Sequence, residues 1–174
     1  QKVQEEESPE FKDLHMVGTV AQIVRLLKMP DGSSTVIIQG KRRFRMIEMT
    51  QTDPFMRASV EILKEQKFDT KNKELNMMFK NIKDLALQII KDSPNIPSEA
   101  QFAIKNIDSP TFLVNFISSN MNADVSKKQD MLEEMEIKSR VMKVLEHLSM
   151  ESQMLEMRNE IHNKVRKDLD KQQR

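Results

Sequence analysis

The sequence predicts an α+β protein, with strands in its first third and helices in the remainder. Residues 17–47 and 55–63 contain β-branched runs between turn residues. From about residue 72, apolar residues recur instead at three- and four-residue steps, which is typical of amphipathic helices. We therefore expect a partial β domain over residues 1–66 and a helical bundle over 67–125. Over 126–174 we expect the bundle to continue into one long helix.

The β part is predicted to contain three strands within residues 17–47 and a fourth over 55–63. The tripeptide Pro30-Asp31-Gly32 separates the first two strands, because proline presets φ and glycine supplies the positive φ of a tight turn. Gly40 is expected to open a second turn. In the fourth strand, three apolar residues alternate with polar ones: Ala58, Val60 and Ile62.

Capping residues and prolines set the expected helix boundaries. A wide apolar stripe predicts a helix that starts near residue 72 and stops at Asp92-Ser93-Pro94, since proline cannot continue a helix. Ser98 is expected to cap a short helix, and Ser109, followed by proline, to cap the next. The sequence Ser126-Lys127-Lys128-Gln129 has the spacing of a capping box.

A single long helix is expected from residue 137 to residue 174, because this stretch contains neither glycine nor proline. At 1.5 Å per residue, such a helix would be about 55 Å long, longer than a small domain. Its second half carries a thin apolar stripe in a charged background. We therefore expect it either to project from the bundle or to pair with another helix in a coiled coil.

Composition excludes several classes of protein. The chain has 174 residues and no cysteine, so a disulfide framework and any cysteine-based metal or redox site are excluded. The sequence holds no apolar run long enough for a transmembrane helix, and we expect a cytoplasmic protein. A net charge of +1 gives no general electrostatic case for nucleic-acid binding. Methionine is unusually common, at 14 residues. Its flexible side chain suits surfaces that accept many partners, although ordinary core filling is the simpler explanation.

The sequence carries no motif for catalysis, for a cofactor or for a metal. It contains no phosphate-binding loop, no HExxH and no GxSxG. The three histidines, His15, His147 and His162, are scattered, and we expect each to be a surface or packing residue. Ser126 and Lys127 are adjacent, and adjacent residues on a helix do not face each other, so they form no catalytic dyad.

Two groups of residues are candidates for binding. The first is a basic cluster around Phe44, which could meet acidic partners or nucleic acid, or could be a solvated turn: Lys41, Arg42, Arg43 and Arg45. The second is apolar and could either bind exposed segments of unfolded proteins or fill the core of the sheet: Met29, Met46, Met49, Phe55 and Met56.

The run GTVAQIVRLLKMPDG, followed by TVIIQGKRRFRM, resembles the amino-terminal domain of Lon, an ATP-dependent bacterial serine protease. The end of the chain, NKVRKDLDKQQR, resembles the end of the long helix that precedes the ATPase domain in that family. The resemblance implies a partial PUA-like β-barrel and a piece of a longer chain. It also implies a homohexamer in which this region captures misfolded and short-lived regulatory proteins. ATP, Mg and the catalytic Ser-Lys pair would belong to other domains.

Three alternatives remain open at this point. The region could mainly organise the hexamer, with clients chosen elsewhere. It could bind nucleic acid through the basic cluster, in which case binding would depend steeply on salt. It could also be a free-standing binding domain without a protease, although the Lon-like carboxyl-terminal helix argues against that.

Overall fold

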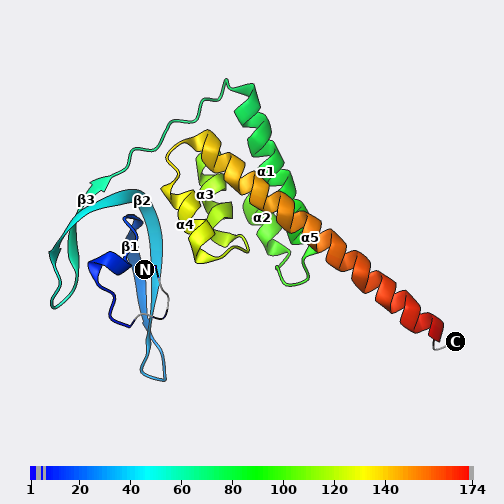
Figure 1. Cartoon of the computed structure of the whole chain (residues 1–174), viewed down its shortest axis with the longest axis horizontal. Coiled ribbons are helices and arrows are strands. Elements are labelled where there is room, and N and C mark those ends of the chain that lie inside the picture. The colour runs from blue at the N-terminus through cyan, green and yellow to red at the C-terminus, as the bar shows by residue number, and fades with distance from the viewer. Residues whose placement is uncertain (3–4, 6, 173–174) are drawn as a thin grey trace. The chain divides into compact units, whose positions relative to one another are not determined.

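The computed structural model describes residues 1–2, 5 and 7–172. The chain divides into two compact units, Gln1–Glu65 and Gln66–Arg174. The first unit contains the strands and the second the α-helices, so the expected change from β to α structure is confirmed (Figure 1). Before the first strand, the chain forms a short 3-10 helix, η1 (Phe11–Asp13).

The strands form one antiparallel sheet in the order β1-β2-β3: β1 (Val17–Lys28), β2 (Ser34–Gln51) and β3 (Arg57–Ile62). The first predicted turn is confirmed. The Asp31 carboxylate accepts hydrogen bonds from the backbone N–H and the hydroxyl of Ser33, at 2.9 and 2.6 Å. Gly32 adopts a φ of 85°. These residues close the turn locally, as aspartate and glycine do in tight turns.

The second predicted turn, at Gly40, is wrong. β2 runs without interruption through Gly40, and its pairing with β1 contains a β-bulge at this point. Val20 pairs with Arg42 and Ala21 with Gly40, which leaves Lys41 as the extra residue. Gly40 is tightly placed, since a Cβ there would lie 3.1 Å from Cγ2 of Thr19. The glycine therefore permits close approach of the two strands rather than a chain reversal.

β3 confirms the predicted alternation. Its apolar residues Ala58, Val60 and Ile62 pair with Met49, Met46 and Phe44 of β2. Cross-strand partners point to the same side of a sheet, so these six residues share one face. In the described part of the chain, β1 and β3 are the edges of an open three-stranded sheet, and the partial barrel remains a prediction.

The second unit contains five α-helices within the described residues: α1 (Lys73–Asp92), α2 (Glu99–Lys105), α3 (Pro110–Asn120), α4 (Val125–Glu133) and α5 (Ile137–Gln172). The side chain of Asn72 accepts from the backbone N–H of Leu75 at the start of α1. Ser109 caps α3, as predicted, and accepts from the N–H of Phe112 at 3.3 Å. Ser98 precedes α2 but its side chain makes no capping hydrogen bond.

The predicted capping box at Ser126 is wrong. α4 starts at Val125, two residues earlier than that box implies, and its cap is Asp124, which accepts from the N–H of Lys127 at 2.8 Å. Asp124 has the extended backbone of an N-cap residue, whereas Ser126 already lies inside the helix. A carboxylate at this position also suits the positive end of the helix dipole.

The core of the second unit lies between α1, α3 and the first half of α5. Its most deeply buried side chains are fully enclosed: Ile82, Val114, Val141 and Val144. The apolar stripe predicted for α1 faces this core, with Leu75, Met78, Phe79, Ala86, Ile89 and Ile90 also buried. Helices before and after residue 126 contribute to the same core.

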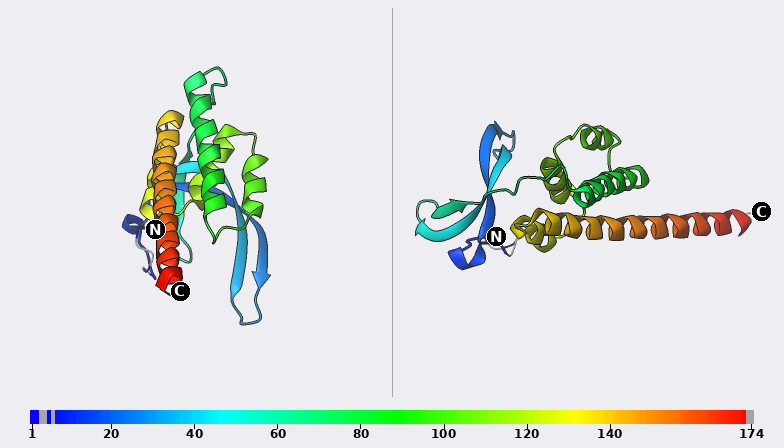
Figure 2. Two further views of the ribbon diagram at one scale, coloured as in Figure 1. Left: turned by 90° about the vertical axis from the view of Figure 1, so that its right-hand side faces the viewer. Right: turned by 90° about the horizontal axis from the view of Figure 1, so that it is seen from above.

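The long helix is confirmed. α5 has 36 residues and is therefore about 54 Å long. Figure 2 shows its second half extending past the other helices of the unit. From residue 150 onward, the apolar stripe of α5 is exposed: Met150, Met154, Met157, Ile161, Val165 and Leu169. Gln173 and Arg174, the last two residues of the predicted helix, lie outside the described residues. No helix among those described is long and apolar enough to cross a membrane.

Candidate functional site

A groove of about 910 Å³ lies in the β unit, beside the loop that joins β2 to β3. One wall is the amino-terminal segment, including Pro9 and Phe11, and the other is Met49 with the loop residues. Apolar side chains predominate in its lining, and the full set is Glu7, Ser8, Pro9, Glu10, Phe11, Lys12, Met49, Thr52, Pro54, Phe55 and Met56. This size suits a few side chains of an extended polypeptide.

Local hydrogen bonds hold both walls of the groove. The backbone N–H of Glu10 donates to the Asp13 carboxylate at 2.9 Å, which fixes η1 and the position of Phe11. On the other wall, the side-chain amide of Gln51 donates to the carbonyl of Asp53 at 2.9 Å. The Arg57 guanidinium lies 5.0 Å from the ring centroid of Phe55, a cation–π contact.

Three of the five apolar candidates meet in this groove. Phe55 and Met56 are 56% and 44% exposed, and Met49 is half-buried beside them. Met46 is buried in the sheet, at 7% exposed, and offers no accessible surface. Met29 lies at the β1–β2 turn, where its backbone hydrogen-bonds with Gly32 and Ser33, and it is exposed outside the groove. The sequence did not predict that Pro9 and Phe11 line this groove, because they lie about 40 residues away from Met49 and no sequence pattern connects the two segments.

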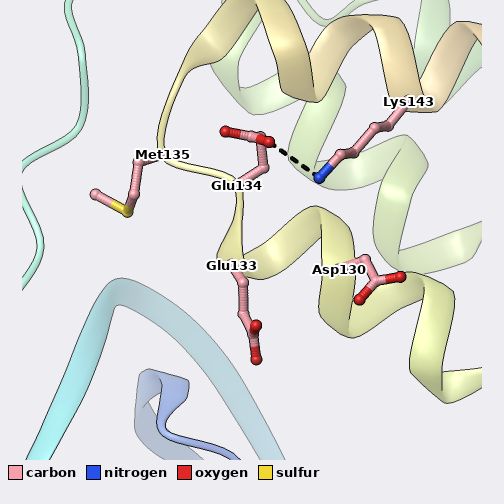
Figure 3. A pocket seen from close by; sticks show the side chains of 5 residues that line it. All are labelled: Asp130, Glu133, Glu134, Met135 and Lys143. Carbon is pink, nitrogen blue, oxygen red and sulfur yellow. Dashed lines mark ion pairs between the residues drawn. The ribbon is translucent and has the colours of Figure 1, made fainter.

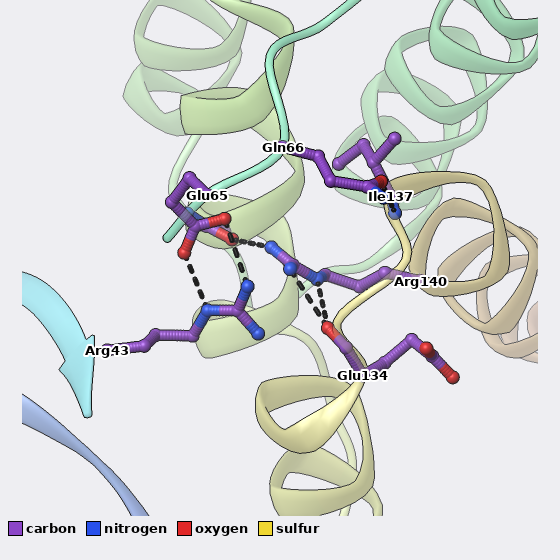
Figure 4. A network of polar contacts seen from close by, with 7 residues as sticks. Arg43, Glu65, Gln66, Glu134, Ile137 and Arg140 are labelled. Carbon is purple, nitrogen blue, oxygen red and sulfur yellow. Dashed lines mark hydrogen bonds and ion pairs between the residues drawn. The ribbon is translucent and has the colours of Figure 1, made fainter. Parts of the chain in front are cut away.

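The four residues of the basic cluster differ in their exposure to solvent. Lys41, Arg42 and Arg45 are exposed, but Arg43 is buried at 6% exposed. Its guanidinium makes a two-point ion pair with Glu65, at 2.6 and 3.0 Å (Figure 4). Planar guanidinium and carboxylate groups suit this arrangement, which ties the chain after β3 back onto β2. Arg43 is therefore structural, and only three cations remain at the surface.

A second buried arginine occupies a core position of α5. Arg140 is 2% exposed, and its Nη2 and Nε donate to the carbonyl of Glu134 at 2.9 and 3.1 Å (Figure 4). Its Nη1 donates to the side-chain oxygen of Asn115 at 3.2 Å. Nearby, the N–H of Ile137 donates to the Gln66 side chain at 3.1 Å. Arg140 follows the buried Ile137 by three residues, so the two lie on the same face of α5. This spacing is the sequence signal that Arg140 faces the core.

A smaller hollow of about 270 Å³ lies in the helical unit and is lined by Asp130, Glu133, Glu134, Met135 and Lys143 (Figure 3). Glu134 and Lys143 form an ion pair at 2.9 Å. Hydrogen bonding to Lys143, and then to the N–H of Glu136, lowers the pKa of the Glu134 carboxyl. Among the described residues, no group of three or more acidic or histidine side chains is placed to hold a metal ion.

Comparison with known proteins identifies the family. Residues 1–150 match the model of the ATP-dependent protease La (LON) substrate-binding domain. The Lon protease of Flavobacterium johnsoniae is 50% identical over 171 residues, which cover 98% of this chain and 21% of that protein. The Lon protease of Cytophaga hutchinsonii is 45% identical over 174 residues, 100% of this chain and again 21% of the relative. The chain thus spans about a fifth of the length of these relatives.

Solved structures have the same fold. The N-terminal domain of the Mycobacterium avium complex Lon protease aligns with a TM-score of 0.65 at 17% identity, covering 82% of this chain and 75% of that one. A Lon N-terminal domain protein from Xanthomonas campestris aligns with a TM-score of 0.53 at 15% identity, covering 75% and 67%. Together with the family match over residues 1–150, these comparisons establish that the chain belongs to the Lon substrate-binding domain family.

Proposed function

We propose that this chain captures misfolded and short-lived regulatory proteins for an ATP-dependent Lon protease, by binding their exposed apolar segments. The observation that carries the proposal is the groove between the amino-terminal segment and the β2–β3 loop, with Phe55 and Met56 exposed at its wall. Unfolded chains expose apolar side chains and folded proteins bury most of them. An accessible apolar groove therefore distinguishes the two without reading a particular sequence.

The expected affinity of one groove is weak. Fully burying a phenylalanine or methionine side chain contributes about 1.5–3 kcal/mol, and Phe55 and Met56 are already partly covered. The entropy lost on association offsets much of this gain, so dissociation constants of roughly 10–1,000 μM are expected for a single site. Weak single sites suit capture by an assembly, because several copies acting on one client raise the effective affinity without new contacts.

The test is fluorescence anisotropy with one labelled polypeptide, presented to the chain either folded or permanently unfolded. We expect selective and salt-tolerant binding of the unfolded form. The double variant Phe55→Ser/Met56→Ser should weaken this binding about tenfold or more, because it removes most of the accessible apolar wall. The control is Met77→Ser/Phe102→Ser, which changes the same residue types at positions 66% exposed on α1 and α2. Equal loss in both variants would refute groove capture.

The exposed stripe on α5 favours a second role, in which this helix pairs subunits of a homohexamer. Met150, Met154, Met157 and Ile161 recur at alternating steps of four and three, the spacing of a coiled-coil seam. All four are more than half exposed. Burying such a seam against a second helix would remove this apolar surface from water.

Sedimentation measurements test the pairing. Met157→Lys/Ile161→Lys places two charges in the seam and should reduce self-association. Asn159→Lys/Asn163→Lys adds the same charges on the same turns but outside the seam, and should leave association unchanged. Identical sedimentation of the parent and both variants over a range of concentrations would count against pairing.

The two roles separate in a full-length Lon enzyme carrying this domain. If the domain captures clients, Phe55→Ser/Met56→Ser should slow degradation of an unfolded protein, with hexamers and cleavage of small peptides intact. If the domain mainly organises the ring, hexamers should break instead, and cleavage of small peptides should fall with them.

A further inference from the structure

The seam proposed for pairing α5 helices carries methionine at three successive positions. Met150, Met154 and Met157 are 53%, 70% and 62% exposed. Among the described residues, the buried apolar side chains of the same helix are instead all aliphatic: Ile137, Val141, Val144 and Leu148. Methionine on α5 therefore lies on the side that faces solvent in a single chain.

These three side chains are open to oxidation at sulfur. An oxidant must reach the thioether, so exposed methionines react with peroxides before buried ones do. In the reaction with hydrogen peroxide, the sulfur lone pair attacks one oxygen and the O–O bond breaks. The sulfur is oxidised and keeps that oxygen as a sulfoxide, and the peroxide is reduced to water. A methionine sulfoxide reductase reverses the change, since the oxygen leaves as water while two thiols become one disulfide.

Oxidation would weaken a pair of α5 helices. A sulfoxide is strongly polar, and in an apolar seam it would be buried without water or a hydrogen-bond donor. In a pair of identical helices each seam position occurs twice, so each oxidised methionine places two such groups in the interface. Because Met150, Met154 and Met157 are consecutive in the seam, their oxidation would affect it over an unbroken stretch.

We propose that Met150, Met154 and Met157 form a modification site at which a peroxide controls the pairing of α5 helices. This inference rests on the proposed pairing of subunits and adds its regulation. Paired helices cover the three sulfurs and unpaired helices expose them. The peroxide therefore reacts with the unpaired chain, and the sulfoxides keep that chain unpaired until a reductase restores the thioethers.

The test treats the 174-residue chain with hydrogen peroxide and measures self-association by sedimentation. Mass spectrometry of its peptides identifies the methionines that have gained oxygen. At a dose that oxidises the three seam methionines but not the buried Met78 and Met131, the association constant should fall about tenfold or more. Treatment with a methionine sulfoxide reductase and a thiol should restore it.

Leucine variants separate the seam from the other exposed methionines. Met150→Leu/Met154→Leu/Met157→Leu keeps an apolar seam of similar volume that cannot form sulfoxides, so its association should not respond to peroxide. Met77→Leu/Met142→Leu is the matched control, because it removes methionines that are 66% and 54% exposed but lie outside the seam. Its association should remain as sensitive as that of the parent.

A glutamine variant tests the effect of polarity without any oxidant. Met154→Gln/Met157→Gln places neutral polar groups in the seam while keeping residues that favour a helix. Its association constant should fall about tenfold or more before peroxide is added. Circular dichroism should show that the helical content of every variant matches that of the parent.

An equal loss of association in the parent and in the seam leucine variant would overturn the inference, because oxidation elsewhere would then be the cause. Unchanged association of a chain whose seam methionines are oxidised would overturn it as well. The pairing proposal has its own readout, which is the effect of Met157→Lys/Ile161→Lys. If those charges disrupt association and peroxide does not, the inference fails alone. If the parent does not associate, pairing and its regulation fail together.

Discussion

Replacing Ile82 with alanine tests the central packing of the helical unit. Ile82 lies on α1 and is fully buried, at 0% exposed, among residues that include Val114 of α3 and Val144 of α5. The substitution removes three carbon atoms. At about 0.8 kcal/mol for each buried methylene, the transfer contribution is about 2.4 kcal/mol. A partly relaxed cavity adds to this, so we expect a loss of about 3–4 kcal/mol in the free energy of unfolding.

The matched control is Met142→Ala, which also removes three heavy side-chain atoms, on α5 at a position that is 54% exposed and lies outside the proposed pairing seam. It should change stability by less than about 0.5 kcal/mol, because little apolar surface is lost and alanine is the better helix former. For a unit of roughly 110 residues, the entropy of unfolding converts the Ile82→Ala loss into a fall of about 14 °C in Tm. Thermal and urea unfolding followed by circular dichroism measures both. A fall of less than about 4 °C, or equal effects at the two positions, would contradict the packing described here.

Three further predictions concern single contacts. Gly18→Ala should cost about 1–2 kcal/mol in urea unfolding of the β unit, because its Cβ would lie 2.8 Å from Cζ of the Phe44 ring. Asp124→Ala should lower the free energy of unfolding by about 1 kcal/mol, and Ser126→Ala should leave it almost unchanged, since only Asp124 caps α4. Equal losses in the two variants would contradict the capping role of Asp124. Burial raises the pKa of Glu151, so the folded form favours the protonated acid and stability falls as pH rises through that pKa. Glu151→Gln should therefore raise the urea midpoint at neutral pH and flatten its pH dependence; a midpoint that falls would contradict this.

Local chemistry accounts for the features that sequence reasoning predicted correctly. The turn at Pro30-Asp31-Gly32 closes through hydrogen bonds within three residues, and Ser109 caps α3 through a contact three residues away. The stripe on α1 and the uninterrupted length of α5 depend on side-chain period and on the absence of glycine and proline. Each of these features depends on residues that are close together along the chain, so it can be predicted from the sequence alone.

Features that depend on a cross-strand neighbour were predicted less well. Gly40 is typical of a turn when only its neighbours in sequence are considered, but opposite Ala21 and beside Thr19 it permits a bulge in a continuous strand. The same bulge sets the side of β2 on which the following arginines lie. A single extra residue moves every later side chain to the other face of a strand.

The sequence by itself therefore determined the change from strands to helices, the order of the helices, and the family. Only the tertiary structure decided which candidate residues are accessible. It buries Met46 and Arg43, and it brings Phe11 into one groove with Phe55 and Met56. Accessibility depends on which residues, distant in sequence, pack against a side chain. The same methionine can fill a core or line a groove, because its own chemistry favours both.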